Sequence, residues 1–265
     1  MEYTTLNNGI KIPLVGFGVY QIPADQTVEA VTTALNNGYR LIDTAEYYQN
    51  EREVGEAIRQ SGIPRKQIFV TTKMPPQANY QEATKRIDES LKALNIDYID
   101  LMLIHWPGQA NVENYQAMED AAKAGKLRSI GLSSFYGRDY QEILEKCDIV
   151  PVVDQNETHV FRQQSEFQKV LEKNGTKLES WSPLAEGRHG IFQNTTLNQI
   201  AQSHQKTVAQ IVLRYLTQRG IIVIPKSIHV DRIAENINLF DFELTDAEMN
   251  QIAALDTEKS IFGWY

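Results

Sequence analysis

The feature that most constrains the fold is a regular alternation of short apolar runs with longer stretches of helical spacing. Eight runs are rich in β-branched and aromatic residues. Between them, apolar residues recur at three- and four-residue intervals, which is typical of helices that cover a sheet. This alternation predicts a parallel sheet, because each helix returns the chain to the same edge. The eight runs are residues 15–20, 40–44, 68–74, 99–106, 129–135, 150–156, 177–183 and 221–227.

Eight consecutive strand–helix units favour a closed barrel over an open sheet. Successive strand runs are spaced close to the ~30 residues of a βαβ unit, and no Ser-, Gly- or Pro-rich linker interrupts them. We therefore expect a single (β/α)8 TIM barrel domain that spans residues 1–265, a length that suits one barrel. An open doubly wound sheet is the alternative, but Gly16 and Gly18 lack the third glycine of the dinucleotide-binding turn.

Two further elements flank the predicted barrel. Asn8 and Gly9 separate two short apolar runs, which predicts an N-terminal β-hairpin. Near the C-terminus, Thr245 is followed three residues later by Glu248, the pattern of a capping box that opens an appended helix.

The composition excludes several classes of partner. The net charge of −8 repels a phosphate backbone, and no basic run marks a nucleic-acid site. A single cysteine, Cys147, leaves no internal disulfide, and the five histidines lack the paired helical spacing of a metal site, so no metal is expected. No apolar stretch reaches about 18 residues and the N-terminus has no apolar signal region, so we expect a cytoplasmic protein without a membrane partner.

Three ionisable residues stand directly after the apolar residues of consecutive strand runs: Asp43, Lys73 and His105. In a (β/α)8 barrel the C-terminal strand ends meet at one mouth, where functional side chains gather. Each residue alone has an ordinary explanation, such as a capping aspartate, a surface lysine or a core histidine. Together they predict a buried charged cluster, which is costly unless it is paired and therefore marks a functional site.

The residues around these positions resemble the aldo-keto reductase superfamily, and the resemblance runs from the opening hairpin to the appended helix. Residues 38–51, GYRLIDTAEYYQNE, are similar to the family segment that carries a catalytic aspartate and tyrosine. The motifs TK at 72–73 and LIHWP at 103–107 resemble the segments that carry its lysine and histidine. The resemblance implies reduction of carbonyl groups. The catalytic tetrad that it implies is Asp43, Tyr48, Lys73 and His105.

The chemistry of carbonyl reduction fits these side chains. The reaction delivers a hydride to the carbonyl carbon and a proton to the carbonyl oxygen. A free tyrosine has a pKa of about 10, so at neutral pH it still holds the proton that it would donate. Lys73 would supply a positive charge that favours the phenolate, and Asp43 would keep that ammonium charged and oriented. His105 would hydrogen-bond the carbonyl oxygen. Tyr47 is adjacent, but the family spacing selects Tyr48, five residues after Asp43, as the acid.

The late strand runs resemble the family segments that hold a nicotinamide. The run SIGLSSF at 129–135 is similar to the segment whose Ser-Asn pair binds the carboxamide, with Ser134 where asparagine is usual. Gln155 matches the glutamine of this site, and the residue before it is Asp154 where the family commonly has asparagine. Trp181 would stack on the nicotinamide ring. The loop after Trp181 would cover the pyrophosphate. The residues implied in these contacts are Ser133, Ser134, Gln155, Trp181, Ser182 and Leu184.

Residues 224–236 resemble the adenosine-phosphate segment of the same family. By that resemblance, Lys226, Ser227 and Arg232 would surround the 2′-phosphate of NADP(H) with charge and hydrogen-bond donors, whereas NAD offers them no anion. Glu235 and Asn236 would contact the adenine side. The resemblance therefore implies NADP(H) as the cofactor.

Aromatic residues are expected at the substrate end of the mouth. Tyr20 and Trp106 end two strand runs and, with His105, would line the substrate pocket. Only nine residues, 107–115, separate Trp106 from the next predicted helix, so the mouth is expected to be open. These features favour a small-molecule aldehyde or ketone as substrate, with broad tolerance. Because no apolar helix face is left over, we expect a monomer.

Two other functions fit the same fold. A regulatory subunit could bind NADP as a sensor with little turnover, although no additional segment for docking a partner is evident. A lyase or isomerase could use Lys73 to form a Schiff base, but the neighbouring Asp43 would keep that lysine charged.

Overall fold

The computed structural model describes residues 1–263, so the last two residues of the predicted domain lie outside the described part. The described residues contain eight parallel strands in one sheet. The strands follow one another in chain order from β3 to β10. Three backbone hydrogen bonds close the ring: from the Gly16 amide to the Val223 carbonyl at 2.8 Å, from the Val223 amide to the Leu14 carbonyl at 2.9 Å and from the Gly18 amide to the Pro225 carbonyl at 3.2 Å. The chain is therefore a (β/α)8 barrel and not an open doubly wound sheet. The strands are β3 (Phe17–Gly18), β4 (Leu41–Asp43), β5 (Phe69–Met74), β6 (Leu101–Ile104), β7 (Ile130–Ser133), β8 (Val153–Glu157), β9 (Lys177–Trp181) and β10 (Ile222–Val223).

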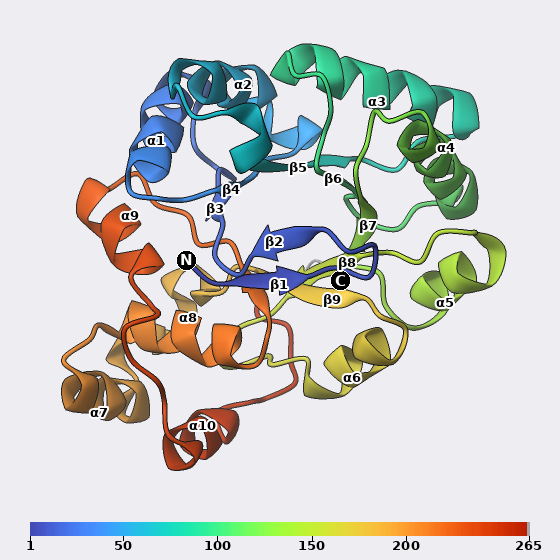
Figure 1. Cartoon of the computed structure of the whole chain (residues 1–265). Helices are drawn as coiled ribbons and strands as arrows, with labels where there is room; N and C mark the ends of the chain where they lie inside the picture. The colour runs from blue at the N-terminus through green and yellow to red at the C-terminus, as the bar shows by residue number, and fades with distance from the viewer. Residues whose placement is uncertain (264–265) are drawn as a thin grey trace.

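Helices follow the strands and surround the barrel (Figure 1). The predicted apolar stripes explain this packing; in α8, for example, Ile211, Val212 and Tyr215 are all buried. Within residues 1–263, every helix is too short or too polar to traverse a lipid bilayer. The helices are α1 (Ala24–Asn36), α2 (Glu51–Gln60), α3 (Tyr80–Leu94), α4 (Asn111–Lys123), α5 (Gly137–Lys146), α6 (Ser165–Lys173), α7 (Thr195–His204), α8 (Val208–Gln218), α9 (Val230–Ile237) and α10 (Asp246–Ala253), with 3-10 turns η1 (Glu46–Tyr48), η2 (Arg65–Gln67) and η3 (Ala185–Gln193).

The predicted β-hairpin closes the N-terminal end of the barrel. β1 (Tyr3–Thr5) pairs with antiparallel β2 (Lys11–Pro13), and Gly9 makes the turn with a φ of +83°, a left-handed conformation that favours glycine. The hairpin lies across the ring in Figure 1. Leu6 and Ile12 reach from it into the apolar interior of the barrel. Near the C-terminus, Thr245 and Glu248 form the predicted capping box of α10.

Strand alternation divides the core into two regions. Leu41, Leu101 and Leu103 point into the barrel, where they meet the apolar residues of the hairpin. Their strand neighbours, such as Ile42 and Met102, face outward and pack beneath the helices. Toward the C-terminal strand ends the inward-facing positions become polar, which places the charged groups at one end of the barrel.

Two kinds of boundary differ from the sequence prediction. The strands are shorter than the apolar runs: β3 and β10 have two residues each, and the last predicted run reaches Pro225, which has no amide to donate to a ladder. Helix α4 starts at Asn111 instead of after Tyr115, and the Asn111 side chain accepts a hydrogen bond from the Gly108 amide at 2.6 Å. The loop that follows Trp106 is therefore shorter than predicted.

Asp154 is a buried carboxyl group on the helix side of β8. Its strand neighbours Val153 and Gln155 point into the barrel, so Asp154 points outward, and it is fully buried. In the described part of the chain, neither of its carboxyl oxygens has a hydrogen-bond partner. Burial raises the pKa of Asp154 to about 8, against the smaller opposing effects of the Asn156 side chain and the Phe135 backbone. The folded protein therefore holds Asp154 as a neutral acid at neutral pH, whereas the unfolded chain ionises it.

Stability should consequently fall as the pH rises from about 4, where the unfolded chain begins to lose the proton, to about 8, where the folded state also begins to lose it. Asp154→Asn removes this titration and keeps the size of the side chain. We expect the variant to be more stable than the wild type at about pH 8, by on the order of 1–3 kcal/mol, and to match it near pH 4. Urea unfolding at both pH values measures the difference. Equal stabilities at the higher pH would contradict a neutral Asp154.

Candidate active site

A cavity of about 1140 Å³ opens at the C-terminal ends of the strands. Its volume exceeds the range of about 300–1,000 Å³ that is usual for small-molecule sites. With the exception of Lys73, every residue that the sequence predicts for the site lines this cavity. These lining residues are Tyr20, Asp43, Tyr48, His105, Trp106, Ser133, Ser134, Gln155, Trp181, Ser182, Leu184, Lys226, Ser227, Arg232, Glu235 and Asn236.

Lys73 lies beneath the cavity at the centre of a hydrogen-bond cluster. Its side chain is fully buried, and Nζ lies 2.5 Å from Asp43 Oδ1. Nζ also donates to the Thr44 carbonyl at 3.1 Å and to the Tyr48 hydroxyl at 3.3 Å. An ammonium has three donors, and each has an acceptor here. The buried charge is thus fully paired, which is the condition under which such a charge is tolerated.

The charges of this cluster act on the acidity of Tyr48. Burial lowers the pKa of Lys73, but the Asp43 carboxylate raises it overall, so the amine stays protonated. Burial, with a smaller contribution from the Asp43 carboxylate, raises the pKa of Tyr48 to about 12 against the opposing effect of the Lys73 ammonium. Lys73 therefore favours the phenolate, as the sequence suggested, yet the net shift is upward. The phenol holds its proton until a strongly basic oxygen faces it.

A short 3-10 turn orients the two adjacent tyrosines differently. The turn η1 follows β4 closely, and Gln49 ends it in the left-handed region with a φ of +57°. Tyr47 is 64% exposed, and its ring contacts that of Trp106 with 5.7 Å between centroids. Tyr48 instead directs its hydroxyl to Lys73. The geometry therefore favours Tyr48 over Tyr47 as a proton donor.

His105 is held as a neutral imidazole. Burial and the Lys73 ammonium keep the pKa of His105 well below its ordinary value. Its ring centroid lies 5.5 Å from that of Tyr48 and 4.7 Å from that of Trp106. Among residues 1–263, its Nδ1 has no hydrogen-bond partner. A neutral ring still carries one N–H that can donate to a substrate oxygen.

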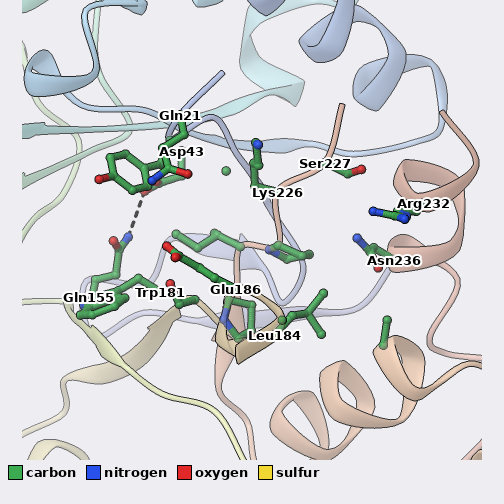
Figure 2. Close-up of a pocket in the computed structure, with 18 of the residues that line it drawn as sticks. Gln21, Asp43, Gln155, Trp181, Leu184, Glu186, Lys226, Ser227, Arg232 and Asn236 are labelled. Carbon is green, nitrogen blue, oxygen red and sulfur yellow. Dashed lines mark hydrogen bonds between the residues drawn. The ribbon is translucent and has the colours of Figure 1, made fainter. Parts of the chain in front are cut away.

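Gln155 reaches across the barrel from β8 to the same cluster. Its Nε2 donates to Asp43 Oδ2 at 2.9 Å, the dashed line in Figure 2. Asp43 therefore accepts from Lys73 with one carboxyl oxygen and from Gln155 with the other. The sequence prediction assigned Gln155 to the nicotinamide and missed this bond, because it joins residues 112 positions apart.

The opposite end of the cavity carries positive charge. In Figure 2, Ser227, Arg232 and Asn236 lie at one end of the pocket, with Lys226 between them and the end that holds Asp43 and Gln155. Lys226 and Arg232 are exposed, and neither forms an ion pair with an acidic side chain of the described residues. Two unpaired cations in a protein of net charge −8 are suited to an anionic ligand.

Several cavity residues escaped the sequence prediction. Thr207 caps α8 and donates to Glu235 at 2.6 Å, so the first turn of α8 borders the cavity. Glu186 lies in η3, and Gln21 has a left-handed φ of +59°. The one sequence signal for Gln21 was its place directly after Tyr20. The other lining residues that were missed are Gly18, Tyr47, Pro183, Gly187, Phe192, Val208, Ala209, Ile224 and Pro225.

Fold and site together define a barrel enzyme in which a phenol and an imidazole line one cavity above a buried ammonium. The sequence model of the aldo/keto reductase family matches residues 14–257, and the chain belongs to that family.

Similar proteins cover nearly the whole chain. The glyoxal reductase of Bacillus subtilis (strain 168) is 40% identical over 259 residues, which are 97% of this chain and 93% of that protein. An aldo-keto reductase enzyme from a Medee basin deep-sea metagenome library has a similar structure, with a TM-score of 0.94, 40% identity and coverage of 98% and 97%. A Bombyx mori aldo-keto reductase in complex with NADP gives a TM-score of 0.92, 34% identity and coverage of 98% and 94%.

Removing one member of the buried ion pair should be strongly destabilising. We expect Lys73→Met to lose about 3–5 kcal/mol of unfolding free energy, because it leaves the Asp43 charge buried and unpaired. Adding Asp43→Asn removes that charge, so the double variant should recover part of the loss. Urea unfolding at neutral pH measures all three proteins, and purely additive losses would contradict the pairing.

Proposed function

We propose that the protein reduces aldehydes and ketones to alcohols with NADPH, with Tyr48 as the general acid. The observation that carries the proposal is the 3.3 Å approach of the Tyr48 hydroxyl to Lys73 Nζ, at one end of a cavity whose other end holds unpaired cations. A proton donor and a site suited to a phosphorylated dinucleotide thus share one cavity. Carbonyl reduction by a nicotinamide cofactor requires this combination.

The side chains of the cluster would manage the proton. When bound, the cofactor would supply the hydride. His105, as a neutral ring, would orient the carbonyl oxygen through its N–H. As negative charge develops on that oxygen, Tyr48 would donate its proton, and the Lys73 ammonium would stabilise the phenolate that remains. Asp43 would keep Lys73 charged and in place, which its 2.5 Å contact with Nζ supports.

The residues near the cluster fit a nicotinamide. Ser133, Ser134 and Gln155 line the cavity at the ends of β7 and β8, where they would bind the carboxamide, and Trp181 at the end of β9 would stack on the ring. Ser134 has a left-handed φ of +61°, a conformation that asparagine adopts more readily than serine. Ser134 therefore takes a conformation suited to asparagine, with a shorter side chain.

The other end of the cavity fits a phosphorylated adenosine. Lys226 and Arg232 would pair with a 2′-phosphate, and Ser227 would add a hydroxyl donor. The NADP complex of the Bombyx mori relative supports this choice of cofactor. The remaining cofactor contacts proposed here are the pyrophosphate residues Ser182 and Leu184 and the adenine residues Glu235 and Asn236.

Aromatic rings favour a small uncharged carbonyl substrate. The ring centroids of Tyr20 and Tyr48 lie 4.9 Å apart, and Trp106 lies against His105. Gln21 adds an uncharged polar group to this wall. We propose small aldehydes and ketones, dicarbonyls among them, and the similarity to a glyoxal reductase supports this class.

The alternative functions differ in what the protein should do in solution. A Schiff base needs a neutral amine, but Asp43 raises the pKa of Lys73 and all three of its N–H groups have acceptors. The sensor alternative predicts tight NADPH binding without oxidation of the cofactor by any aldehyde or ketone. A panel of simple carbonyl compounds, with NADPH oxidation as the readout, separates the sensor from the reductase.

Tyr48→Phe should lower kcat for aldehyde reduction by about 10²–10⁴-fold, the usual contribution of a general acid. NADPH affinity should change little, because the phenol hydroxyl is proposed to donate the proton and not to bind the cofactor. Tyr47→Phe is the matched control, and it should keep the rate within about tenfold, since Tyr47 is directed to the cavity rim. Absorbance of NADPH follows turnover and its fluorescence follows binding. A near-native rate in Tyr48→Phe would refute the assignment.

Arg232→Ala should weaken NADPH binding by about 10–100-fold, because a hydrogen bond to a charged group contributes roughly 1.5–3 kcal/mol. NADH lacks the 2′-phosphate, so its affinity should be the same in the variant and in the wild type. Fluorescence titration with each cofactor measures both affinities. Equal losses for NADPH and NADH would show that Arg232 does not recognise the phosphate.

A further inference from the structure

Glu179 is a buried acid inside the barrel that the proposed mechanism does not use. Its neighbour on β9, Leu178, packs on the helix side, so Glu179 points inward. In the sheet its Cα pairs with those of Gln155 on β8 and Ile222 on β10. The side chain is fully buried, and neither carboxyl oxygen has a hydrogen-bond partner within residues 1–263.

Around Glu179, the described residues provide one ammonium, Lys73, for two carboxyl groups, Asp43 and Glu179 itself. Lys73 uses its three donors on Asp43, the Thr44 carbonyl and Tyr48, so none remains for Glu179. The charged groups that act on Glu179 are Asp43 from β4 and Lys73 from β5. An ionised Glu179 would therefore make the net charge of the interior negative.

We propose that Glu179 is a positioning residue of the catalytic cluster: as a neutral acid it leaves the Lys73 charge available to Tyr48, and as a carboxylate it competes with Tyr48 for that charge. This inference rests on the proposed function, in which Tyr48 alternates between phenol and phenolate. Glu179 does not touch the substrate, and its effect passes through Lys73. Its own titration is simple, since the proton it loses goes to solvent.

The surroundings of Glu179 keep it neutral at neutral pH. Burial and the Asp43 carboxylate together raise the pKa of Glu179 to about 8, against the opposing effects of the Lys73 ammonium and the Gln155 side chain. The neighbouring strands add no other charge at this level, because β8 presents the amide of Gln155 and β10 presents Ile222. Glu179 therefore ionises in the mildly alkaline range.

The effect is most direct in alcohol oxidation, the reverse reaction. Oxidation requires Tyr48 as the phenolate base, so its rate rises with pH as Tyr48 loses its proton. Above about pH 8 the wild-type protein carries an additional negative charge on Glu179, which raises the pKa of Tyr48. Without this carboxylate, Tyr48 should reach the phenolate at lower pH.

The test compares pH profiles of kcat/KM for alcohol oxidation with NADP⁺ in the wild type, Glu179→Gln and Glu179→Asp. Glutamine keeps the shape without the charge, so the rising limb should move down by roughly one pH unit. Aspartate keeps the carboxylate and should retain the wild-type limb. If Glu179→Gln does not fold, Glu179→Met is a second neutral variant of similar length. The proposal is overturned if the rising limb of the Glu179→Gln profile stays at the wild-type pH or moves to higher pH. A change only in the size of kcat/KM, with no shift along the pH axis, would indicate a structural role and would also overturn it.

A second measurement does not need turnover. Infrared spectra of protein with ¹³C-labelled glutamate should contain a protonated carboxyl band at neutral pH that is absent from Glu179→Gln and fades as the pH passes about 8. Absence of this band overturns the proposal whether or not the protein is a reductase. A wild-type protein that turns over no carbonyl compound or alcohol overturns the proposed function itself, while normal turnover with an unshifted limb overturns only the role of Glu179.

Discussion

The contact between the Lys73 ammonium and the Asp43 carboxylate is the interaction on which the rest of the site depends. Both groups are buried, and neither could stay charged there alone, because desolvation of an unpaired ion costs several kcal/mol. The two residues come from neighbouring strands, β4 and β5, so their contact requires the parallel sheet to be formed. Lys73 also donates to the Tyr48 hydroxyl, and Asp43 also accepts from the Gln155 side chain. The barrel and the reactive cluster are therefore parts of one structure.

Much of the fold could be predicted from the sequence because it depends on local patterns. The apolar runs identified all eight strands, and the helical stripes, the Asn8–Gly9 turn and the Thr245 capping box identified the elements around them. Strand length could not be predicted, since it depends on where neighbouring strands stop pairing. The start of α4 was misjudged because the side chain of Asn111 binds the Gly108 amide from inside the helix, which is not the usual capping position.

The residues of the candidate site were found by two kinds of signal, and those that were missed lacked both. Asp43, Lys73 and His105 stand at strand ends, and the cofactor residues follow from the family resemblance. The bond from Gln155 to Asp43 depends on closure of the ring and has no local signature. Glu179 did carry a signal, an acid within an apolar strand run, but its inward direction is visible only once the register with β8 is known.

The residues proposed for proton transfer and those proposed for cofactor binding lie in different halves of the chain. The four residues of the tetrad lie before residue 106, and the residues assigned to the cofactor lie after residue 132. Gln155 joins the halves, because it belongs to the second and binds Asp43 of the first. A partly folded chain in which one half is formed would hold either the proton chemistry or the cofactor site, but not both. Catalytic activity during refolding would accordingly report the completion of the whole barrel and would lag behind the appearance of its secondary structure.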